Sequence, residues 1–276
     1  MNVPSQTAEG LAQAASRNWL TDPLASARVA LACLDLTSLN AQDTEADIAA
    51  LCARAQGPYG PVAAVCVWPR LAAFARKQLP PSIAVAAVAN FPDGSADVER
   101  AVRETSGIVQ SGAQELDLVL PYVQLLAGEY SAVSGMLVAV RKASRGLILK
   151  VILETGALVG REHILRASRL SLDAGADFLK TSTGKTSISA TPEAASVMLG
   201  AIAADPKAAG QVGLKPSGGI RTVKDAAVYI ALTEELLGGA AITPVRFRLG
   251  ASSVLTDIEA VLSGQPGAAP ELAGRY

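Results

Sequence analysis

Histidine and cysteine are scarce in this chain of 276 residues, which has one histidine, His163, and three cysteines. A single imidazole rules out a metal centre built from several histidines, and a Ser-His-Asp hydrolase is improbable because His163 falls in a helix-forming stretch. The cysteines are odd in number and contain no Cys-x-x-Cys pair, which argues against a disulfide framework and against a structural zinc site. We therefore expect buried free thiols at Cys33, Cys52 and Cys66.

Charge is also sparse, since charged residues make up 18% of the chain and the net charge is -1. Such a composition provides no basic surface to neutralise a phosphate backbone, so nucleic acid is not an expected partner. No apolar run approaches the roughly 20 residues that a membrane-spanning helix needs, and the first ten residues lack the basic start and apolar core of a secretory signal. We expect a soluble, cytoplasmic protein that makes no contact with a membrane.

Hydrophobic residues, by contrast, make up 50% of the chain, and they form short apolar runs that alternate with Ala-rich amphipathic stretches. Continuous apolar strands indicate burial on both faces, and repeated strand–helix units require parallel pairing with right-handed crossovers. An open doubly wound sheet is the alternative, but no Gly-x-Gly-x-x-Gly follows the first strand. We predict a single (β/α)8 TIM barrel with strands at 29–36, 62–68, 83–90, 115–121, 147–155, 176–182, 212–219 and 246–253.

The pattern divides the chain into three parts. We expect a short helical N-terminal lead-in over residues 1–28, the barrel over 29–263, and a flexible Gly- and Pro-rich C-terminal tail over 264–276. Inside the barrel, side chains that can cap exposed helix amides predict helix starts at Asp43 with Thr44, at Thr191-Pro192-Glu193 and at Thr222.

Two lysines lie inside apolar, strand-like runs: Lys180 in Ala-Asp-Phe-Leu-Lys-Thr-Ser and Lys215 in Val-Gly-Leu-Lys-Pro-Ser-Gly-Gly. A buried ammonium group is costly unless it is paired or neutralised. Asp35, Asp117 and Lys150 lie in three further predicted strands, and the carboxyl ends of barrel strands converge on one mouth. We therefore expect these five side chains to meet in one low-dielectric cavity, where each shifts the pKa of the others.

Two interpretations of this cluster are open. The first is a structural ion-pair network, although buried ion pairs often contribute little net stability. The second is catalysis by a neutral lysine: lowering a lysine pKa from about 10.4 to about 7 requires roughly 4–5 kcal/mol, which desolvation and repulsion from Lys215 would supply to Lys180. Acid–base chemistry then falls to Asp117 and Lys215, with a tyrosine as a further candidate. We assign the nucleophile to Lys180 because small residues that leave room for a bound substrate follow it, namely Thr181, Ser182, Thr183 and Gly184.

Glycine- and serine-rich segments lie at the carboxyl ends of the last two predicted strands, where barrels commonly bind phosphate through backbone amides and a helix N-terminus. Each turn alone is a weak signal, but together beside the lysines they indicate an anion site, and Lys185 adds a charge. The substrate is therefore expected to be a phosphorylated carbonyl compound. The candidate residues in these turns are Gly218, Gly219, Gly250, Ser252 and Ser253.

Long motifs in colinear order from about residue 29 to 255 resemble those of the deoxyribose-phosphate aldolases. They are Asp35-Leu-Thr-Ser-Leu-Asn40, Val65-Cys-Val-Trp-Pro-Arg70, Asn90-Phe-Pro-Asp-Gly94, Glu115-Leu-Asp-Leu-Val-Leu-Pro-Tyr122, Lys150-Val-Ile-Leu-Glu-Thr-Gly156, Ala174-Gly-Ala-Asp-Phe-Leu-Lys-Thr-Ser-Thr-Gly-Lys185, Leu214-Lys-Pro-Ser-Gly-Gly-Ile-Arg221 and Arg248-Leu-Gly-Ala-Ser-Ser253.

The resemblance implies a class I aldolase of deoxyribonucleoside catabolism. It would reversibly cleave 2-deoxy-D-ribose 5-phosphate to D-glyceraldehyde 3-phosphate and acetaldehyde through a lysine Schiff base, with no metal and no organic cofactor. Lys180 would form the Schiff base, Lys215 would perturb its pKa, and Asp117 would transfer protons through water. Lys150 would pair with Asp117, while Asp35 and Thr37 would line the pocket and contact the substrate hydroxyl or Lys215.

Tyr276 matches a C-terminal tyrosine that, in members of the family that have one, transfers a proton to the acetaldehyde enamine from a flexible tail. Two other functions stay open at this point: a Schiff-base aldolase for another phosphorylated sugar, and a non-catalytic barrel that binds sugar phosphates. The second would need the anion loops but no buried lysine pair. A homodimer is expected only because dimers are common.

Overall fold

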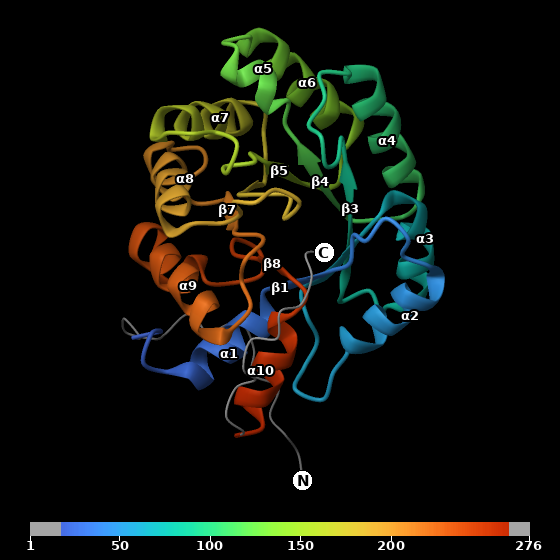
Figure 1. Cartoon of the computed structure of the whole chain (residues 1–276), viewed down its shortest axis with the longest axis vertical. Helices are drawn as coiled ribbons and strands as arrows, with labels where there is room; N and C mark the ends of the chain where they lie inside the picture. Colours follow the sequence, from blue (N-terminus) through green and yellow to red (C-terminus); the bar gives the residue numbers. More distant parts are fainter. Residues whose placement is uncertain (1–17, 265–276) are drawn as a thin grey trace.

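The computed structural model describes residues 18–264, and these form a barrel of eight parallel strands surrounded by helices (Figure 1). The hydrogen-bonded strands follow the order β7-β6-β5-β4-β3-β2-β1-β8. Isolated parallel bridges from Leu214 to Phe247 and from Ser217 to Gly250 join the two ends of this order. The predicted (β/α)8 architecture is confirmed.

The strands and helices alternate along the chain after one preceding helix. The strands are β1 (Leu34–Thr37), β2 (Ala64–Val67), β3 (Ala84–Ala89), β4 (Glu115–Val119), β5 (Ile148–Ile152), β6 (Phe178–Lys180), β7 (Gly213–Lys215) and β8 (Leu249–Ala251). The helices are α1 (Pro23–Ala32), α2 (Glu45–Arg54), α3 (Pro69–Gln78), α4 (Val98–Gln110), α5 (Tyr122–Leu126), α6 (Tyr130–Ala143), α7 (Arg161–Asp173), α8 (Pro192–Ala204), α9 (Val223–Leu237) and α10 (Val254–Leu262), with a short 3-10 turn, η2 (Gly239–Ala241), before β8.

The three helix starts predicted from capping residues are confirmed. Thr44 and Thr222 each form a capping box with an aspartate at the third helical position. The threonine hydroxyl accepts from the backbone amide of that aspartate, and the aspartate carboxylate accepts from the backbone amide of the threonine. Thr191 caps α8, with Pro192 in its first turn.

The first predicted strand begins too early. Residues 29–32 belong to helix α1, which starts with Asp22 as its cap and Pro23 in its first turn, and β1 begins only at Leu34. The helix is favoured because it packs on α9 and α10, where the Trp19 indole just before it donates to Glu234 at 2.7 Å. Helix α1 therefore crosses the expected boundary between the lead-in and the barrel at residue 28.

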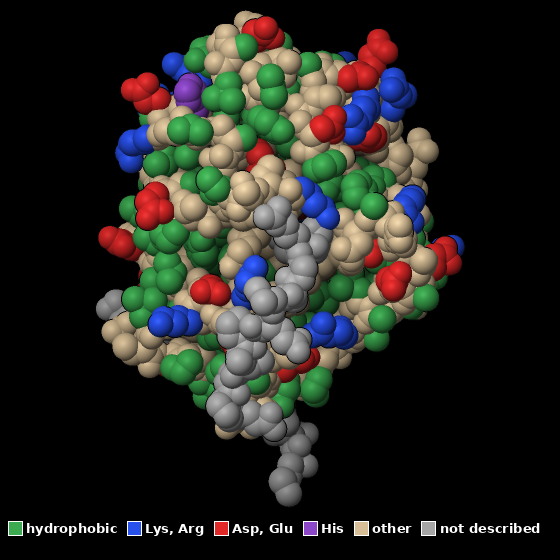
Figure 2. All heavy atoms as spheres, viewed as in Figure 1, with side chains coloured by type: hydrophobic (Ala, Val, Ile, Leu, Met, Phe, Trp, Pro, Cys, Tyr) green, Lys and Arg blue, Asp and Glu red, His purple; other side chains and the backbone are tan. Residues whose placement is uncertain are grey.

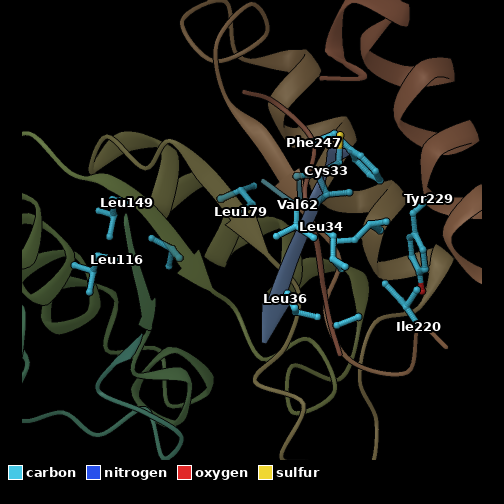
Figure 3. Packing of buried hydrophobic residues seen from close by; sticks show 14 of the residues in the cluster. Cys33, Leu34, Leu36, Val62, Leu116, Leu149, Leu179, Ile220, Tyr229 and Phe247 are labelled. Atoms are coloured by element: carbon cyan, nitrogen blue, oxygen red, sulfur yellow. The ribbon is translucent and has the colours of Figure 1, made fainter. Parts of the chain in front are cut away.

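The main core lies between the strands and the helices. Side chains alternate along a strand, so Leu34 and Leu36 of β1, Leu116 of β4 and Leu179 of β6 all belong to this outer core (Figure 3). The residues between them point into the barrel. This alternation determines which side chains can meet inside it.

Basic and acidic side chains are interspersed on the face of the molecule drawn in Figure 2. Within residues 18–264, no helix is long and apolar enough to cross a membrane.

Candidate active site

The inward-facing positions of five strands carry charged side chains at similar depth. Asp117 of β4 is the register partner of Lys150 on β5, and Lys180 of β6 is the partner of Lys215 on β7. Asp35 lies in the middle of β1 rather than at its end, because the strand continues to Thr37. All five side chains are buried inside the barrel, and the structure brings all five together.

Asp117 is the centre of this cluster. Its Oδ2 atom lies 2.7 Å from the Nζ atoms of both Lys180 and Lys215, and its Oδ1 atom lies 2.9 Å from Nζ of Lys150. One carboxylate thus joins three lysines from three strands.

Asp35 supports the cluster from β1. Its Oδ2 atom is 2.5 Å from Nζ of Lys215 and 3.4 Å from Nζ of Lys150. Among the described residues no donor is aligned for a hydrogen bond to this oxygen, so its contact with Lys215 is an ion pair rather than a directed hydrogen bond. The other oxygen, Oδ1, accepts from Arg248 Nη1 at 2.6 Å.

Two charged members of the cluster, Glu115 and Arg248, were not predicted as site residues. Glu115 Oε2 lies 2.5 Å from Lys150 Nζ, and Glu115 Oε1 accepts from Arg248 Nη2 at 2.8 Å. Both are almost completely buried. The period of two along a strand could have identified them, because Glu115 is two residues before Asp117 and Arg248 is two residues before Gly250.

The two register-paired lysines differ in pKa direction. Burial disfavours the ammonium form of Lys180 and, with repulsion from Lys215, holds its pKa below the ordinary value despite the attraction of Asp117. Burial acts on Lys215 as well, but Asp117 and Asp35 together raise its pKa well above the ordinary value. The contact of Lys215 with a second carboxylate, Asp35, explains why the two pKa values move in opposite directions.

The acidic groups shift in the direction expected beside so many cations. Burial opposes ionisation of Asp117, but Lys150, Lys180 and Lys215 hold its pKa well below the ordinary value. Burial likewise opposes ionisation of Asp35, whose pKa is nevertheless lowered, chiefly by Lys215, Lys150 and Arg248.

Apolar side chains lie beside the charged cluster inside the barrel and exclude water from the lysines. Ile152 of β5 is the register partner of Lys180, and Val88 of β3 is the partner of Asp117. They belong to a small inner core with Cys66, whose sulfur lies 3.8 Å from Asp117 Oδ2. These neighbours explain why desolvation is the largest influence on the pKa of Lys180.

The cysteines are free and buried, as predicted, and no disulfide joins them. Burial raises the pKa of Cys33 to about 12 and that of Cys52 to about 11, and it raises the pKa of Cys66 as well. Within residues 18–264, no group of three or more His, Cys, Asp or Glu side chains is arranged to hold a metal ion.

The loop after β6 is held by a buried acid that sequence reasoning did not single out. Glu154, which follows β5 and has a φ angle of 55°, accepts from the hydroxyls of Thr183 at 2.5 Å and Thr186 at 3.3 Å. Gly184 takes a φ angle of 78° in this loop. Lys185 then extends to the carbonyl of Leu39, to which its Nζ donates at 2.8 Å.

The turn after β7 lies beside β8, in which Gly250 is the middle residue and not part of a turn as predicted. The Gly218 amide donates to the Gly250 carbonyl and the Gly250 amide donates to the Pro216 carbonyl, so these two amides bind backbone in this structure. Gly218 and Gly219 both have φ angles of 80°, a conformation that glycine adopts without strain. Ser253 is the N-cap residue of α10 and makes no side-chain capping bond, and Ser252 precedes it.

Of the two remaining predicted site residues, Thr37 lies within the described structure and Tyr276 does not. The Thr37 hydroxyl donates to the Asp35 carbonyl at 2.8 Å, so in this structure it binds its own strand. Tyr276, together with residues 265–275 of the expected flexible tail, lies outside the described residues.

Comparisons with known proteins match this chain to aldolases of the same fold. The model of the DeoC/LacD family aldolases matches residues 29–265. A deoxyribose-phosphate aldolase of Agrobacterium fabrum is 47% identical over 248 residues, which cover 89% of this chain and 95% of the relative. A solved structure of a candidate deoxyribose-phosphate aldolase from Coccidioides immitis has a TM-score of 0.74 at 32% identity and covers 90% of this chain and 89% of its own. The tetrameric deoxyribose phosphate aldolase from Aeropyrum pernix has a TM-score of 0.71 at 26% identity and covers 91% of this chain and 99% of its own.

Proposed function

This chain belongs to the DeoC/LacD aldolase family, and from that premise we propose that it is a deoxyribose-phosphate aldolase, a class I aldolase that cleaves 2-deoxy-D-ribose 5-phosphate through a Schiff base. The observation that supports this activity most directly is the pairing of Lys180 with Lys215 on one oxygen of Asp117, each at 2.7 Å. A barrel that only bound sugar phosphates would not need a buried lysine pair of this kind.

Contacts favour Lys180 as the nucleophile and Lys215 as the permanent cation. Both lysines share Asp117, but Lys215 has a second carboxylate, Asp35, at 2.5 Å. The lowered pKa of Lys180 increases the fraction of neutral amine, and the raised pKa of Lys215 keeps it charged. Lys180 is also the last residue of β6, and the small residues Thr181 and Ser182 follow it.

The reaction follows from these charges. The neutral amine of Lys180 attacks C1 of the open-chain aldehyde, and loss of water gives an iminium ion. Removal of the C3 hydroxyl proton, with Asp117 as the base acting through water, lets the C2–C3 bond break, releasing D-glyceraldehyde 3-phosphate and leaving an enamine on Lys180. Protonation of the enamine at C2 and addition of water then release acetaldehyde and restore the amine.

We assign the substrate phosphate to the turns after β6, β7 and β8. Helix α10 begins at Val254 beside Ser252 and Ser253, and the first backbone amides of a helix, which lack intrahelical partners, suit an anion. Gly219 and Lys185 complete the proposed site, with Lys185 supplying a charge. In the same proposal Thr37 and Asp35 line the substrate pocket, and Lys150 orients Asp117.

The proposed function is tested by trapping the imine. Acetaldehyde with sodium borohydride is expected to add one ethyl group to Lys180, which peptide mass spectrometry locates, and purified protein is expected to cleave 2-deoxyribose 5-phosphate. Lys180→Leu should lose both the adduct and at least about a thousandfold of the turnover. Lys207→Leu, which changes an exposed lysine, should keep both. An adduct that formed only on other lysines would disprove the assignment.

Substrate identity is tested with the same enzyme. Cleavage of 2-deoxyribose 5-phosphate should exceed cleavage of fructose and tagatose phosphates, and the reverse order would favour an aldolase for another phosphorylated sugar.

The phosphate assignment makes a separate prediction. Lys185→Ala should raise KM for 2-deoxyribose 5-phosphate about tenfold, because one cation is lost from the anion site, and should leave kcat/KM for unphosphorylated 2-deoxyribose nearly unchanged. Steady-state kinetics with both sugars measure the two effects. Equal losses on both substrates would show that Lys185 does not bind the phosphate.

The oligomeric state of this chain and the catalytic role of its C-terminal tyrosine stay predictions. The related Aeropyrum pernix enzyme is tetrameric, and a homodimer remains the base-rate expectation for this chain. The role of Tyr276 in protonating the enamine rests on the family resemblance alone.

A further inference from the structure

A second layer of charge lies in the barrel around Asp35 and Lys150. It consists of Glu115 at the start of β4 and Arg248 just before β8. The guanidinium group of Arg248 bridges the two acids, at 2.6 Å from Asp35 Oδ1 and 2.8 Å from Glu115 Oε1, and it lies 5.7 Å from the centre of the Phe178 ring. We call Glu115 and Arg248 the lower pair.

The lower pair completes a cluster of seven buried ionisable side chains. Every carboxylate in it contacts at least two cations: Asp35 contacts three, Asp117 contacts three and Glu115 contacts two. Four basic side chains stand against three acidic ones, so full ionisation leaves one excess positive charge in a medium that solvates it poorly. The cluster becomes neutral when one lysine loses its proton.

The contacts identify which lysine that is. In the described part of the chain, Lys150 contacts three carboxylates and Lys215 contacts two, whereas Lys180 contacts only Asp117, which it shares. Arginine keeps its proton in any case. Deprotonation of Lys180 therefore gives up less electrostatic attraction to carboxylates than deprotonation of Lys150 or Lys215.

Two other ionisable groups, Cys66 and Glu154, interact with Lys180 electrostatically without forming an ion pair with it. Cys66 of β2 is a buried thiol whose raised pKa keeps it neutral. Glu154, in the loop after β5, accepts from the hydroxyls of Thr183 and Thr186 and interacts with Lys180 electrostatically, but among the described residues it forms no ion pair with a cation.

We propose that Glu115 and Arg248 are positioning residues for the aldol reaction: as the lower pair, whose opposite charges cancel, they hold Lys150 and Asp35 in their ion pairs so that Lys180 is the neutral member of the cluster. The proposal rests on the proposed function, because it assigns the charge state of the same nucleophile. Neither residue needs to touch the substrate.

Two substitutions that change the charge of the cluster in opposite directions test this proposal. Glu115→Gln removes a negative charge at nearly constant shape, so the pH at which Lys180 becomes trappable should fall by about one unit. Arg248→Met removes a positive charge, so the same midpoint should rise by about one unit and trapping on the acidic side should slow about tenfold. The double variant restores the original balance of one excess positive charge and should return the midpoint toward that of the unmodified protein.

The measurement is the initial rate of borohydride trapping of acetaldehyde on Lys180 from pH 5 to 10, followed by peptide mass spectrometry. Retro-aldol kcat/KM is measured over the same range. Glu115→Asp and Arg248→Lys are matched controls that keep the charge and disturb the geometry, so they should lower rates with little movement of the midpoint.

Three outcomes would overturn the inference: unmoved midpoints in the neutral variants, shifts of the same sign in both, or equally large shifts in the charge-keeping controls. If Arg248→Met does not fold, Glu115→Gln with its Asp control decides the question. If the unmodified protein forms no adduct on Lys180, the proposed function itself fails. Normal trapping with unmoved variants rejects only the role of the lower pair.

Discussion

At the scale of single residues, Lys180 and Lys215 show how much one extra contact changes. They are register partners that donate to the same oxygen of Asp117, yet their pKa values move in opposite directions. Asp35, at 2.5 Å from Lys215, is the difference between them. A covalent intermediate needs one neutral amine, and the second lysine makes the first easier to deprotonate.

Replacing the second lysine tests this relation. In Lys215→Leu the pKa of Lys180 should rise because a positive neighbour is lost while Asp117 remains. A neutral amine is needed, so the acidic limb of the pH profile of kcat/KM should move to higher pH, with a loss of about 10- to 100-fold at pH 7. Circular dichroism checks that the variant is folded. An unmoved pH profile in a folded variant would contradict the electrostatic role.

At the scale of elements, the short strands β6 and β7 depend on close approach. Each has three residues, and Gly213 at the start of β7 leaves room for the ring of Phe178 from β6. A Cβ atom at Gly213 would collide with Phe178 Cε1 and would lie 2.5 Å from the Arg246 carbonyl oxygen. Glycine is required here by space and not by an unusual φ angle. The same ring lies beside the guanidinium of Arg248, so strand packing and the charged cluster are linked.

Two glycine substitutions should therefore have opposite effects on stability. Gly213→Ala is expected to lower the free energy of unfolding by about 1–3 kcal/mol through overpacking. Gly200→Ala, at an exposed position of α8 with nothing within 4 Å of the added carbon, should raise it by about 0.5–1 kcal/mol through helix propensity. Urea unfolding measures both, and a stabilised Gly213→Ala variant would contradict the close approach of β6 and β7.

At the scale of the whole molecule, the barrel encloses its charges and depends on their protonation. Asp35 and Asp117 have lowered pKa values in the folded state relative to the ordinary value of 3.8. Their contribution to stability is therefore fully present above about pH 5 and is lost as the pH falls through the folded-state values. The raised pKa of Lys215 acts at the other end, because its contribution is present below the ordinary value of 10.5 and is lost as the pH rises through the folded-state value.

Acid unfolding should expose this dependence. Asp35→Asn is expected to reduce the free energy of unfolding by about 3–5 kcal/mol at pH 7, because it leaves buried cations without a partner. The difference from the unmodified protein should shrink as the pH falls below the ordinary aspartate value of 3.8 toward the lowered folded-state pKa of Asp35. Urea titrations at several pH values give the two curves. Glu99→Gln, at a side chain that is 91% exposed, is the control and should run parallel to the unmodified protein.

Much of this molecule could be predicted from local patterns. Strand–helix alternation predicted the (β/α)8 barrel, and hydroxyl side chains at Thr44, Thr191 and Thr222 predicted three helix starts. Polar residues inside apolar runs identified five charged side chains that meet inside the barrel. These predictions succeed because burial, capping and period-two alternation act within a few residues along the chain.

Other features depend on distant segments. Residues 29–32 resemble a strand in isolation but form the end of a helix, because α1 packs on α9 and α10 far along the chain. Glu115 and Arg248, 133 residues apart, meet only when β4 and β8 lie in one closed barrel. The sequence alone determined that lysines and aspartates would share one buried space. Only the tertiary structure decided how many carboxylates each lysine contacts, because strand register and barrel closure set the distances on which the charge of Lys180 depends.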